Sequence, residues 1–279
     1  MSKFYHLLGV DSPFDPIHRY TTSWLLPPLV LAIIRALLSL YAFVTIFTIF
    51  GYDDSHDTSY KVRQWFSYFT NLTYCGLAFY FLFSALYTFS YARTGKAWLQ
   101  SWPRPLQAAH AIFYTTIVTF PFLVTIVYWG VLYKNPWFPV AEEAWSNISQ
   151  HALNSFYVLF EIFLTRTSPP PPLHLLFLVI LLALYLALAY LCRATEGFYV
   201  YNFLDPITGK GHVAGYCVGI LVAACVIFGI VWFVIWLRNK ATQKLGKFAH
   251  GRSSKRKNGS VEDGEGEVVE MNAQILGKP

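Results

Sequence analysis

Six long apolar runs, separated by short polar segments, dominate the chain. They cover residues 25–50, 66–90, 108–133, 145–165, 173–192 and 213–237. About 20 apolar residues are needed for a helix to cross the hydrocarbon core of a bilayer. Unpaired backbone groups are too costly in lipid, and no alternating barrel pattern is present, so the runs must be helices. The pattern predicts an all-α polytopic membrane helix bundle with six transmembrane helices.

The same pattern divides the chain into three parts. Residues 1–24 are expected to form a cytosolic N-terminal segment, residues 25–237 the six-span membrane domain, and residues 238–279 a cytosolic tail. The tail begins with eight Lys and Arg and no acid between Arg238 and Lys257, and then becomes acidic. A segment of this composition cannot bury a core, so we expect the tail to be disordered.

The charges of the loops predict the orientation of the bundle. The loop after the second run carries Arg93, Lys96 and Arg104 without an acid, and the loop after the fourth run carries Arg166. The loops after the first and third runs contain several Asp and Glu residues. Because basic loops stay on the cytosolic side, both termini are expected to be cytosolic.

The composition of the chain indicates that lipid, not water, surrounds most of this fold. Of the 279 residues 55% are hydrophobic and 13% are charged, whereas a soluble domain has about 25% charged residues. The formal net charge of +6 comes mainly from the tail. We therefore expect the basic tail to contact anionic lipids, and we expect no nucleic-acid partner. No metal or nucleotide motif is present, so no cofactor is predicted.

Polar residues inside two of the runs are the candidate functional residues, because a polar side chain inside the membrane needs a partner or a water-filled cavity. In the second run Thr70 and Thr73 share one helical face, with Asn71 beside them. In the fourth run His151, Asn154 and Glu161 recur at helical spacing and form one polar stripe. This stripe is expected to face the bundle interior. His110 and His174 lie near the cytosolic side and are assigned roles facing the loops.

Thr70 and His151 are expected at matching depth, because both helices run from lumen to cytosol. At ~1.5 Å per residue, each lies ~8 Å below the lumenal surface. A neutral imidazole there could accept the threonine proton, and the alkoxide could attack an ester carbonyl. Asn71 or Asn154 could orient the base or donate to the oxyanion. The alternative is structural: a threonine bonded to its own backbone and a histidine that bridges helices.

Four blocks of the sequence resemble a known family. They are Tyr68-Phe-Thr-Asn-Leu72, the segment from Asn147 to Glu161, Arg166-Thr-Ser168, and Gly197-Phe-Tyr-Val-Tyr-Asn-Phe-Leu204. Together they resemble the family of the androgen-induced protein and the androgen-dependent TFPI-regulating protein, multi-span threonine hydrolases of fatty acid esters of hydroxy fatty acids. The resemblance implies Thr70 as nucleophile and His151 as its base. The chain departs from the family pattern at Ile148, Thr73 and Asn202.

The sequence thus favours an integral membrane lipid-ester hydrolase with a Thr/His dyad, and its substrate would reach the site from the bilayer. One alternative is a non-catalytic membrane lipid-binding or scaffold protein. A transporter is disfavoured, because no inverted repeat is detectable. In the absence of a sorting motif, the expected location is the endoplasmic reticulum or another endomembrane.

Overall fold

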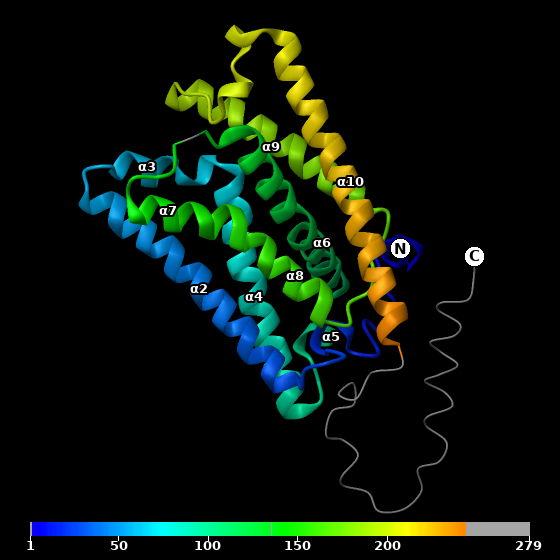
Figure 1. The fold of residues 1–279 in the computed structure, drawn as a ribbon. Helices are drawn as coiled ribbons and strands as arrows, with labels where there is room; N and C mark the ends of the chain where they lie inside the picture. Colours follow the sequence, from blue (N-terminus) through cyan, green and yellow to red (C-terminus); the bar gives the residue numbers. More distant parts are fainter. Residues whose placement is uncertain (1, 135, 244–279) are drawn as a thin grey trace, which may run out of the picture.

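The computed structural model describes residues 2–134 and 136–243, and this part of the chain is helical almost throughout (Figure 1). The long helices are α2 (Pro28–Ser55), α4 (Phe69–Thr94), α6 (Arg104–Val127), α9 (His174–Glu196) and α10 (Lys210–Thr242). The shorter helices are α1 (Ser2–Leu7), α3 (Ser59–Gln64), α5 (Trp98–Ser101), α7 (Ala141–Ile148) and α8 (Asn154–Leu164). The predicted all-α membrane bundle is confirmed.

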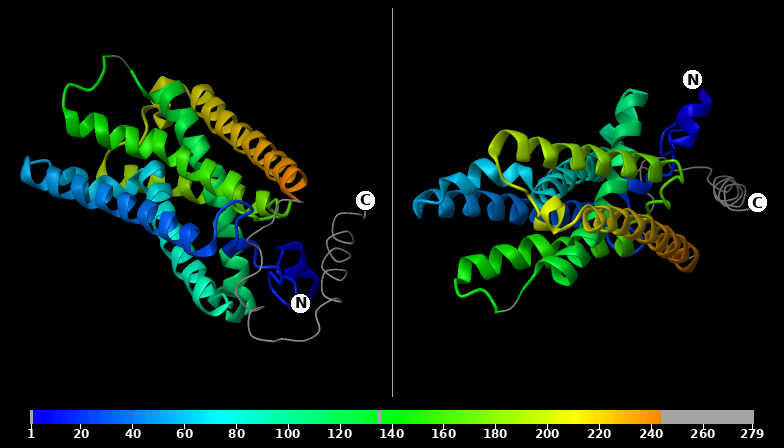
Figure 2. Two further views of the ribbon diagram at one scale, coloured as in Figure 1. Left: turned by 60° about the horizontal axis from the view of Figure 1, so that its bottom comes forward. Right: turned by 90° about the horizontal axis from the view of Figure 1, so that it is seen from above.

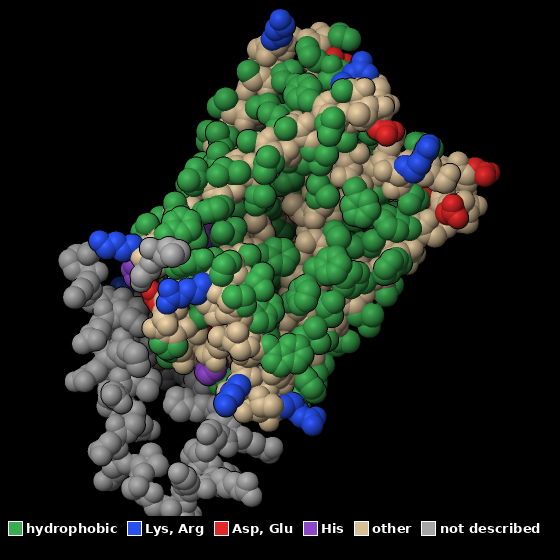
Figure 3. Space-filling model, turned by 180° about the vertical axis from the view of Figure 1, so that it is seen from behind, with side chains coloured by type: hydrophobic (Ala, Val, Ile, Leu, Met, Phe, Trp, Pro, Cys, Tyr) green, Lys and Arg blue, Asp and Glu red, His purple; other side chains and the backbone are tan. Residues whose placement is uncertain are grey.

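Five helical stretches are long and apolar enough to span a membrane: α2, α4, α6 with its extension to Leu132, α9 and α10. They coincide with five of the six predicted runs. The remaining run, residues 145–165, forms a continuous helical path through α7 and α8 but is not among the five. Its polar stripe lowers its hydropathy, so the count of six spans stays a prediction. Figure 3 shows a broad hydrophobic belt, with charged side chains gathered at its two ends.

Helices α4 and α6 form the centre of the bundle, and α9 and α10 lie at its margin. In the most apolar stretch of α6 56% of residues are buried, against 17% in α9. Helix α2 packs along α4, where Ala42 and Ala78 are small enough to let the backbones approach. The Ser39 hydroxyl donates across this contact to the carbonyl of Ala78 at 2.9 Å. The margin is therefore where lipid can reach the interior most easily.

Two short π-helical segments interrupt the regular helices. The segment η3 (Tyr128–Leu132) continues α6, and η4 (Ser149–Leu153) joins α7 to α8. Such segments are rare and are frequent at functional sites. The second one contains His151.

The N-terminal segment is docked on one end of the bundle rather than lying free. Leu8, Val10 and Phe14 are buried against side chains of α4, α5 and α6. The backbone of Ser23 pairs with that of Thr165, at the end of α8. The same end carries α5 and the last turns of α10 (Figure 2). The two ends of the described chain thus lie on one side of the bundle, and the assignment of that side to the cytosol stays a prediction.

The boundary of the predicted tail differs from the structure at Arg238. This residue lies inside α10, which continues to Thr242, and only 6% of it is exposed. Its guanidinium donates to the carbonyls of Ile162 and Thr167, so it holds the end of α8 against α10. Residues 244–279, on which the predicted disorder and most of the predicted lipid contacts fall, lie outside the described residues.

Candidate active site

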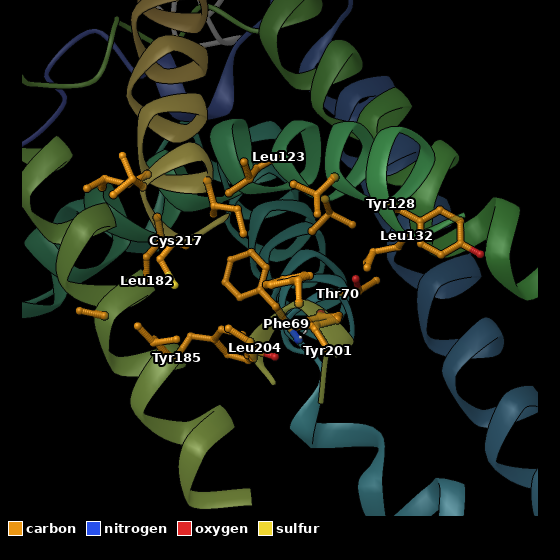
Figure 4. Close-up of a pocket in the computed structure, with 18 of the residues that line it drawn as sticks. Phe69, Thr70, Leu123, Tyr128, Leu132, Leu182, Tyr185, Tyr201, Leu204 and Cys217 are labelled. Atoms are coloured by element: carbon orange, nitrogen blue, oxygen red, sulfur yellow. Dashed lines mark hydrogen bonds between the residues drawn. The ribbon is translucent and has the colours of Figure 1, made fainter. Parts of the chain in front are cut away.

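A cavity of about 280 Å³ opens at the end of the bundle away from the N-terminal segment (Figure 4). Its walls come from the start of α4, the end of α6 with η3, the loop after α9, and the facing sides of α9 and α10. Nearly all of the lining side chains are apolar or aromatic. Thr70 is one of the few polar side chains on the wall. Because α9 and α10 are the marginal helices, the cavity lies where a lipid chain can enter.

Thr70 lies in the first turn of α4, and this position determines which groups its hydroxyl can bond. The chain bends at Tyr68, whose backbone is extended (φ −90°, ψ 131°), and α4 begins at the next residue. A threonine inside a helix normally donates to the carbonyl four residues back. Thr70 has no complete helical turn before it. Its hydroxyl therefore faces the cavity region instead of being absorbed by its own helix.

The loop before α10 supplies Tyr201, which closes over the start of α4. The Tyr201 hydroxyl accepts the N–H of Phe69 at 3.2 Å, and it interacts with both the side chain and the backbone N–H of Thr70. Figure 4 shows the three residues together on one wall. Burial raises the pKa of the Tyr201 phenol, which keeps it protonated, and its hydroxyl also interacts with the Tyr185 hydroxyl. The site thus places the Tyr201 phenol beside the Thr70 hydroxyl, and this phenol accepts the first N–H groups of α4.

Sequence reasoning did not single out Tyr201, although it belongs to the block from Gly197 to Leu204. That block carried a signal, because its Tyr stands in an aromatic segment immediately before the last span. Tyr128 was missed altogether. It lies near the end of an apolar run, where an aromatic residue at the membrane surface is the ordinary interpretation.

His151 is buried in η4, and its imidazole stacks flat on the Tyr128 ring. The two ring centroids are 3.5 Å apart and the planes differ by 5°. The Tyr128 hydroxyl is held by the side-chain oxygen of Asn147 at 2.5 Å, one turn before His151. Within the described residues, Nδ1 of His151 is buried and has no hydrogen-bond partner. The imidazole is therefore fixed by stacking and keeps one ring nitrogen uncommitted.

Thr70 and His151 lie on adjacent elements but are not bonded to each other. Their sequence neighbours meet directly, since the Gln150 side chain donates to Asn71 Oδ1 at 3.1 Å. Tyr128 lines the cavity together with Thr70, whereas His151 is not part of the lining. The Tyr128 ring consequently separates the imidazole from the cavity, and no direct hydrogen bond joins these two described residues. The catalytic pairing stays a prediction.

Both asparagines that sequence reasoning offered as oxyanion donors are engaged elsewhere. The Asn71 amide donates to the carbonyl of Trp65 at 2.8 Å, which stabilises the bend before α4. Asn154 accepts from the hydroxyl of Thr125 at 2.9 Å and donates to the carbonyl of Pro121 at 3.4 Å. These contacts tie α8 to α6. Asn71 and Asn154 therefore act as links between elements in this structure.

The remaining polar residues of the two runs also have partners. Thr73 donates to the carbonyl of Thr70 at 2.8 Å. Glu161 is fully buried and forms an ion pair with the equally buried Arg35 of α2. The hydroxyl of Tyr80 donates to the same carboxylate at 2.9 Å. The stripe from His151 to Glu161 thus faces the interior, and its Glu161 end is fully paired.

A different threonine–histidine pair is hydrogen-bonded. The hydroxyl of Thr115 lies 2.6 Å from His174 Nδ1, and His174 Nε2 lies 3.3 Å from the carbonyl of Leu8. Thr115 is 0% exposed and His174 1%. His174 faces the docked N-terminal segment, in line with the expected loop-facing role, but it is buried beneath that segment. His110 also contacts that segment through Tyr20, is 5% exposed, and lies among the rings of Tyr20, Tyr80 and Tyr87.

Comparison with known proteins gives one match. The family model described as FAR-17a/AIG1-like protein matches residues 18–234, which include every element around the cavity. No curated protein and no solved structure matches the chain significantly. In the part of the chain that the structure describes, no group of three His, Cys, Asp or Glu side chains converges as in a metal site.

Proposed function

The chain belongs to the FAR-17a/AIG1-like protein family, and on that premise we propose that it is a membrane-embedded hydrolase of long-chain lipid esters. The observation that carries the proposal is the position of Thr70. Its hydroxyl lies at the start of α4, on the wall of an apolar cavity that opens between marginal helices. A hydroxyl at that place would contact a substrate inside the cavity instead of bulk water.

The proposed nucleophile gains from its place at the helix start. The N-terminal end of a helix carries about half a positive elementary charge, which stabilises an anion within the first turn. An alkoxide forming on Thr70 therefore lies in a favourable field. In the proposed reaction Thr70 Oγ attacks the ester carbonyl carbon as its proton passes to the imidazole of His151. The tetrahedral intermediate then expels the alcohol, which takes that proton, and water cleaves the acyl-threonine.

Charge on the carbonyl oxygen needs donors in place before the reaction starts. We assign this role to the Tyr201 phenol, in place of Asn71 and Asn154. Three features support the assignment: the contact of Tyr201 with Thr70, the raised pKa of its phenol, and the engagement of both asparagine amides elsewhere. Removing one such donor typically slows catalysis about 10²- to 10³-fold.

His151 is proposed as the base, and this role requires a movement of Tyr128. In the described conformation the Tyr128 ring covers the imidazole. When substrate enters and displaces the ring, the uncommitted imidazole nitrogen can turn toward Thr70. A π-helical segment carries each of the two rings. Such segments are frequent at functional sites, which supports a functional role for the stacked pair.

The substrate class follows from the lining of the cavity. An apolar wall favours an acyl chain by ~0.8 kcal/mol for each buried CH₂. Thr70 and Tyr201 lie together on one wall, where the ester carbonyl would lie. A long-chain ester delivered from the bilayer therefore suits the cavity better than a soluble ester. The proposed compartment is the endoplasmic reticulum or another endomembrane, where such lipids are available.

A fluorophosphonate probe tests the proposal, because it reacts with an activated hydroxyl. Purified protein in nanodiscs should be labelled, and Thr70→Ala and His151→Ala should abolish labelling. Thr73→Val is the matched control, since Thr73 lies one turn along the same helix and bonds to the backbone. Thr70→Ser should retain labelling. Labelling that survives Thr70→Ala would reject Thr70 as the nucleophile.

A non-catalytic lipid-binding protein is the second candidate. The stacking of His151 on Tyr128 favours it, because the imidazole is closed off from the cavity in the described conformation. This function predicts that a radiolabelled lipid ester is retained in the cavity and recovered intact after long incubation. Release of free fatty acid from the wild-type protein, but not from Thr70→Ala, would exclude it.

A further inference from the structure

Three arginine side chains converge on the turn after α8, the stretch Arg166-Thr-Ser168. Arg19, from the N-terminal segment, donates through Nη1 to the hydroxyl of Ser168. Arg238, from α10, donates through Nη2 to the carbonyl of Thr167. The third side chain belongs to Arg166 itself. Segments that are far apart in the sequence thus bring three positive charges to three consecutive residues, which we call the arginine turn.

No carboxylate in the described part of the chain pairs directly with the charges of the arginine turn, although Asp15 attracts Arg19 and Glu161 attracts Arg238. Among the described residues, none of the three guanidinium groups forms an ion pair with Asp or Glu. Asp15 is the acid that acts on Arg19, and its two oxygens accept the backbone N–H groups of Arg19 and Tyr20 at 2.8 and 3.1 Å. The pKa of Arg166 is lowered, first by burial and then by the positive charge of Arg19. The turn therefore has an excess of positive charge.

One of the three guanidinium groups is buried and only partly satisfied. Arg238 is 6% exposed, and it donates to the carbonyls of Ile162 and Thr167 and to the side chain of Asn239. Carbonyls at a helix end carry only about half a negative elementary charge in total. Its Nε is buried without a hydrogen-bond partner among the described residues. Within the same part of the chain, the half-buried side chain of Arg166 forms no ion pair with Asp or Glu.

We propose that the arginine turn is a binding site for a phosphate group, and that the group belongs to the head of an anionic phospholipid. Planar guanidinium groups match the geometry of phosphate oxygens and can bind them in pairs. The turn lies where α8 ends and α10 leaves the bundle, at the side predicted to face the cytosol. The cytosolic leaflet is rich in anionic lipids. The site is separate from the cavity at Thr70, so the proposal does not depend on the hydrolase.

Binding of a short-chain lipid tests this site. The full chain in detergent is titrated with dioctanoyl phosphatidic acid, with dioctanoyl phosphatidylcholine, and separately with inorganic phosphate, and bound molecules are counted by native mass spectrometry. Phosphatidic acid should bind more tightly than phosphatidylcholine. Arg166→Gln should weaken its binding about tenfold or more, because one hydrogen-bonded charge pair is lost. Arg166 forms no ion pair within the described fold, so this variant should fold normally.

Arg93→Gln is the matched control, because Arg93 is exposed at the end of α4 on the same side of the bundle and lies against the Phe89 ring. Its binding curve should equal that of the wild type. Displacement of the lipid by inorganic phosphate, with the same dependence on Arg166, would support the phosphate site and identify a free phosphate as its ligand. Equal binding of phosphatidic acid to the wild type, Arg166→Gln and Arg93→Gln would overturn the proposal.

Discussion

Two threonine–histidine pairs in this bundle have opposite properties. Thr115 and His174 are hydrogen-bonded at 2.6 Å, and His174 is further oriented by the carbonyl of Leu8. Both are completely buried, and the N-terminal segment covers them. Thr70 and His151 are not bonded to each other, yet Thr70 lines a cavity and His151 keeps an unpartnered ring nitrogen. Bonding geometry alone would therefore select Thr115 and His174 instead of the pair proposed as catalytic.

The difference shows what each pair can do. A bonded pair that no substrate can reach stabilises the fold, since all of its hydrogen-bonding capacity is used inside the protein. A buried nitrogen without a partner costs stability. Such a group is retained where it serves another purpose, and the neighbouring cavity offers one. Access and unused hydrogen-bonding capacity thus point to Thr70 and His151, while ideal geometry points to Thr115 and His174.

The largest effect is expected from exchanging the threonines for an isosteric residue. Thr70→Val should reduce ester hydrolysis about 10³-fold or more, because it removes the nucleophile. Thr115→Val should leave the rate per folded molecule near that of the wild type. Release of fatty acid in nanodiscs, normalised to folded protein, measures both. A loss of activity that is greater in Thr115→Val than in Thr70→Val would reverse the assignment of the two pairs.

The paired end of the polar stripe gives the next largest effect, this time on stability. Glu161→Gln leaves the buried Arg35 without its carboxylate, which should cost about 3–5 kcal/mol of unfolding free energy. Tyr80→Phe removes one hydrogen bond to the same carboxylate and should cost about 1–2 kcal/mol. Reversible unfolding in mixed detergent measures the two. If Glu161→Gln unfolds no more readily than Tyr80→Phe, the ion pair contributes little.

A smaller effect on stability is expected from the sealed threonine–histidine pair. Thr115→Val leaves His174 Nδ1 without its partner, which should cost about 1–3 kcal/mol. Because His174 also contacts Leu8, the N-terminal segment should detach more often, and trypsin should cut after Arg19 faster. The cleavage rate at Arg19, compared between Thr115→Val and Thr70→Val, checks this. Equal rates would mean that the pair does not hold the segment.

The bundle itself was predictable because membrane helices leave a strong pattern. Long apolar runs are typical of membrane spans, and five of the six predicted runs match long helices. The run at residues 145–165 was harder to classify, since the polar residues that make it interesting also lower its hydropathy. Sequence placed Thr70 and His151 near each other through depth, and the contact between Asn71 and Gln150 agrees with that depth.

What the sequence could not predict depends on contacts across long separations. Because of the bend at Tyr68, the Thr70 hydroxyl does not bond to its own helix, and no residue type in the sequence predicts this bend. Tyr128 covers His151 through a stacking contact between two π-helical segments that are far apart in the sequence. Docking of residues 8–14 over His174 depends on a few apolar side chains in a segment too short to show a pattern. These three features decide which threonine is accessible.

The smallest effect concerns Tyr128, because its ring covers the histidine of only one of the two pairs, His151. Its hydroxyl is held by Asn147 at 2.5 Å, and Tyr128→Phe removes this hydrogen bond while keeping the ring. If the ring must leave His151 before the reaction, the variant should move more easily. A typical hydrogen bond contributes about 0.5–1.5 kcal/mol, so turnover should rise about two- to tenfold.

The direction of this change is the informative result, because an increase is not expected if Tyr128 simply supports the site. Asn147→Ala removes the same bond from the other side and should raise turnover by a similar factor. The double variant should gain no more than either single variant, because all three lack the same bond. A fall in turnover in both single variants would show that the stacked arrangement of Tyr128 on His151 is itself the working form. The imidazole would then have to act from where it lies.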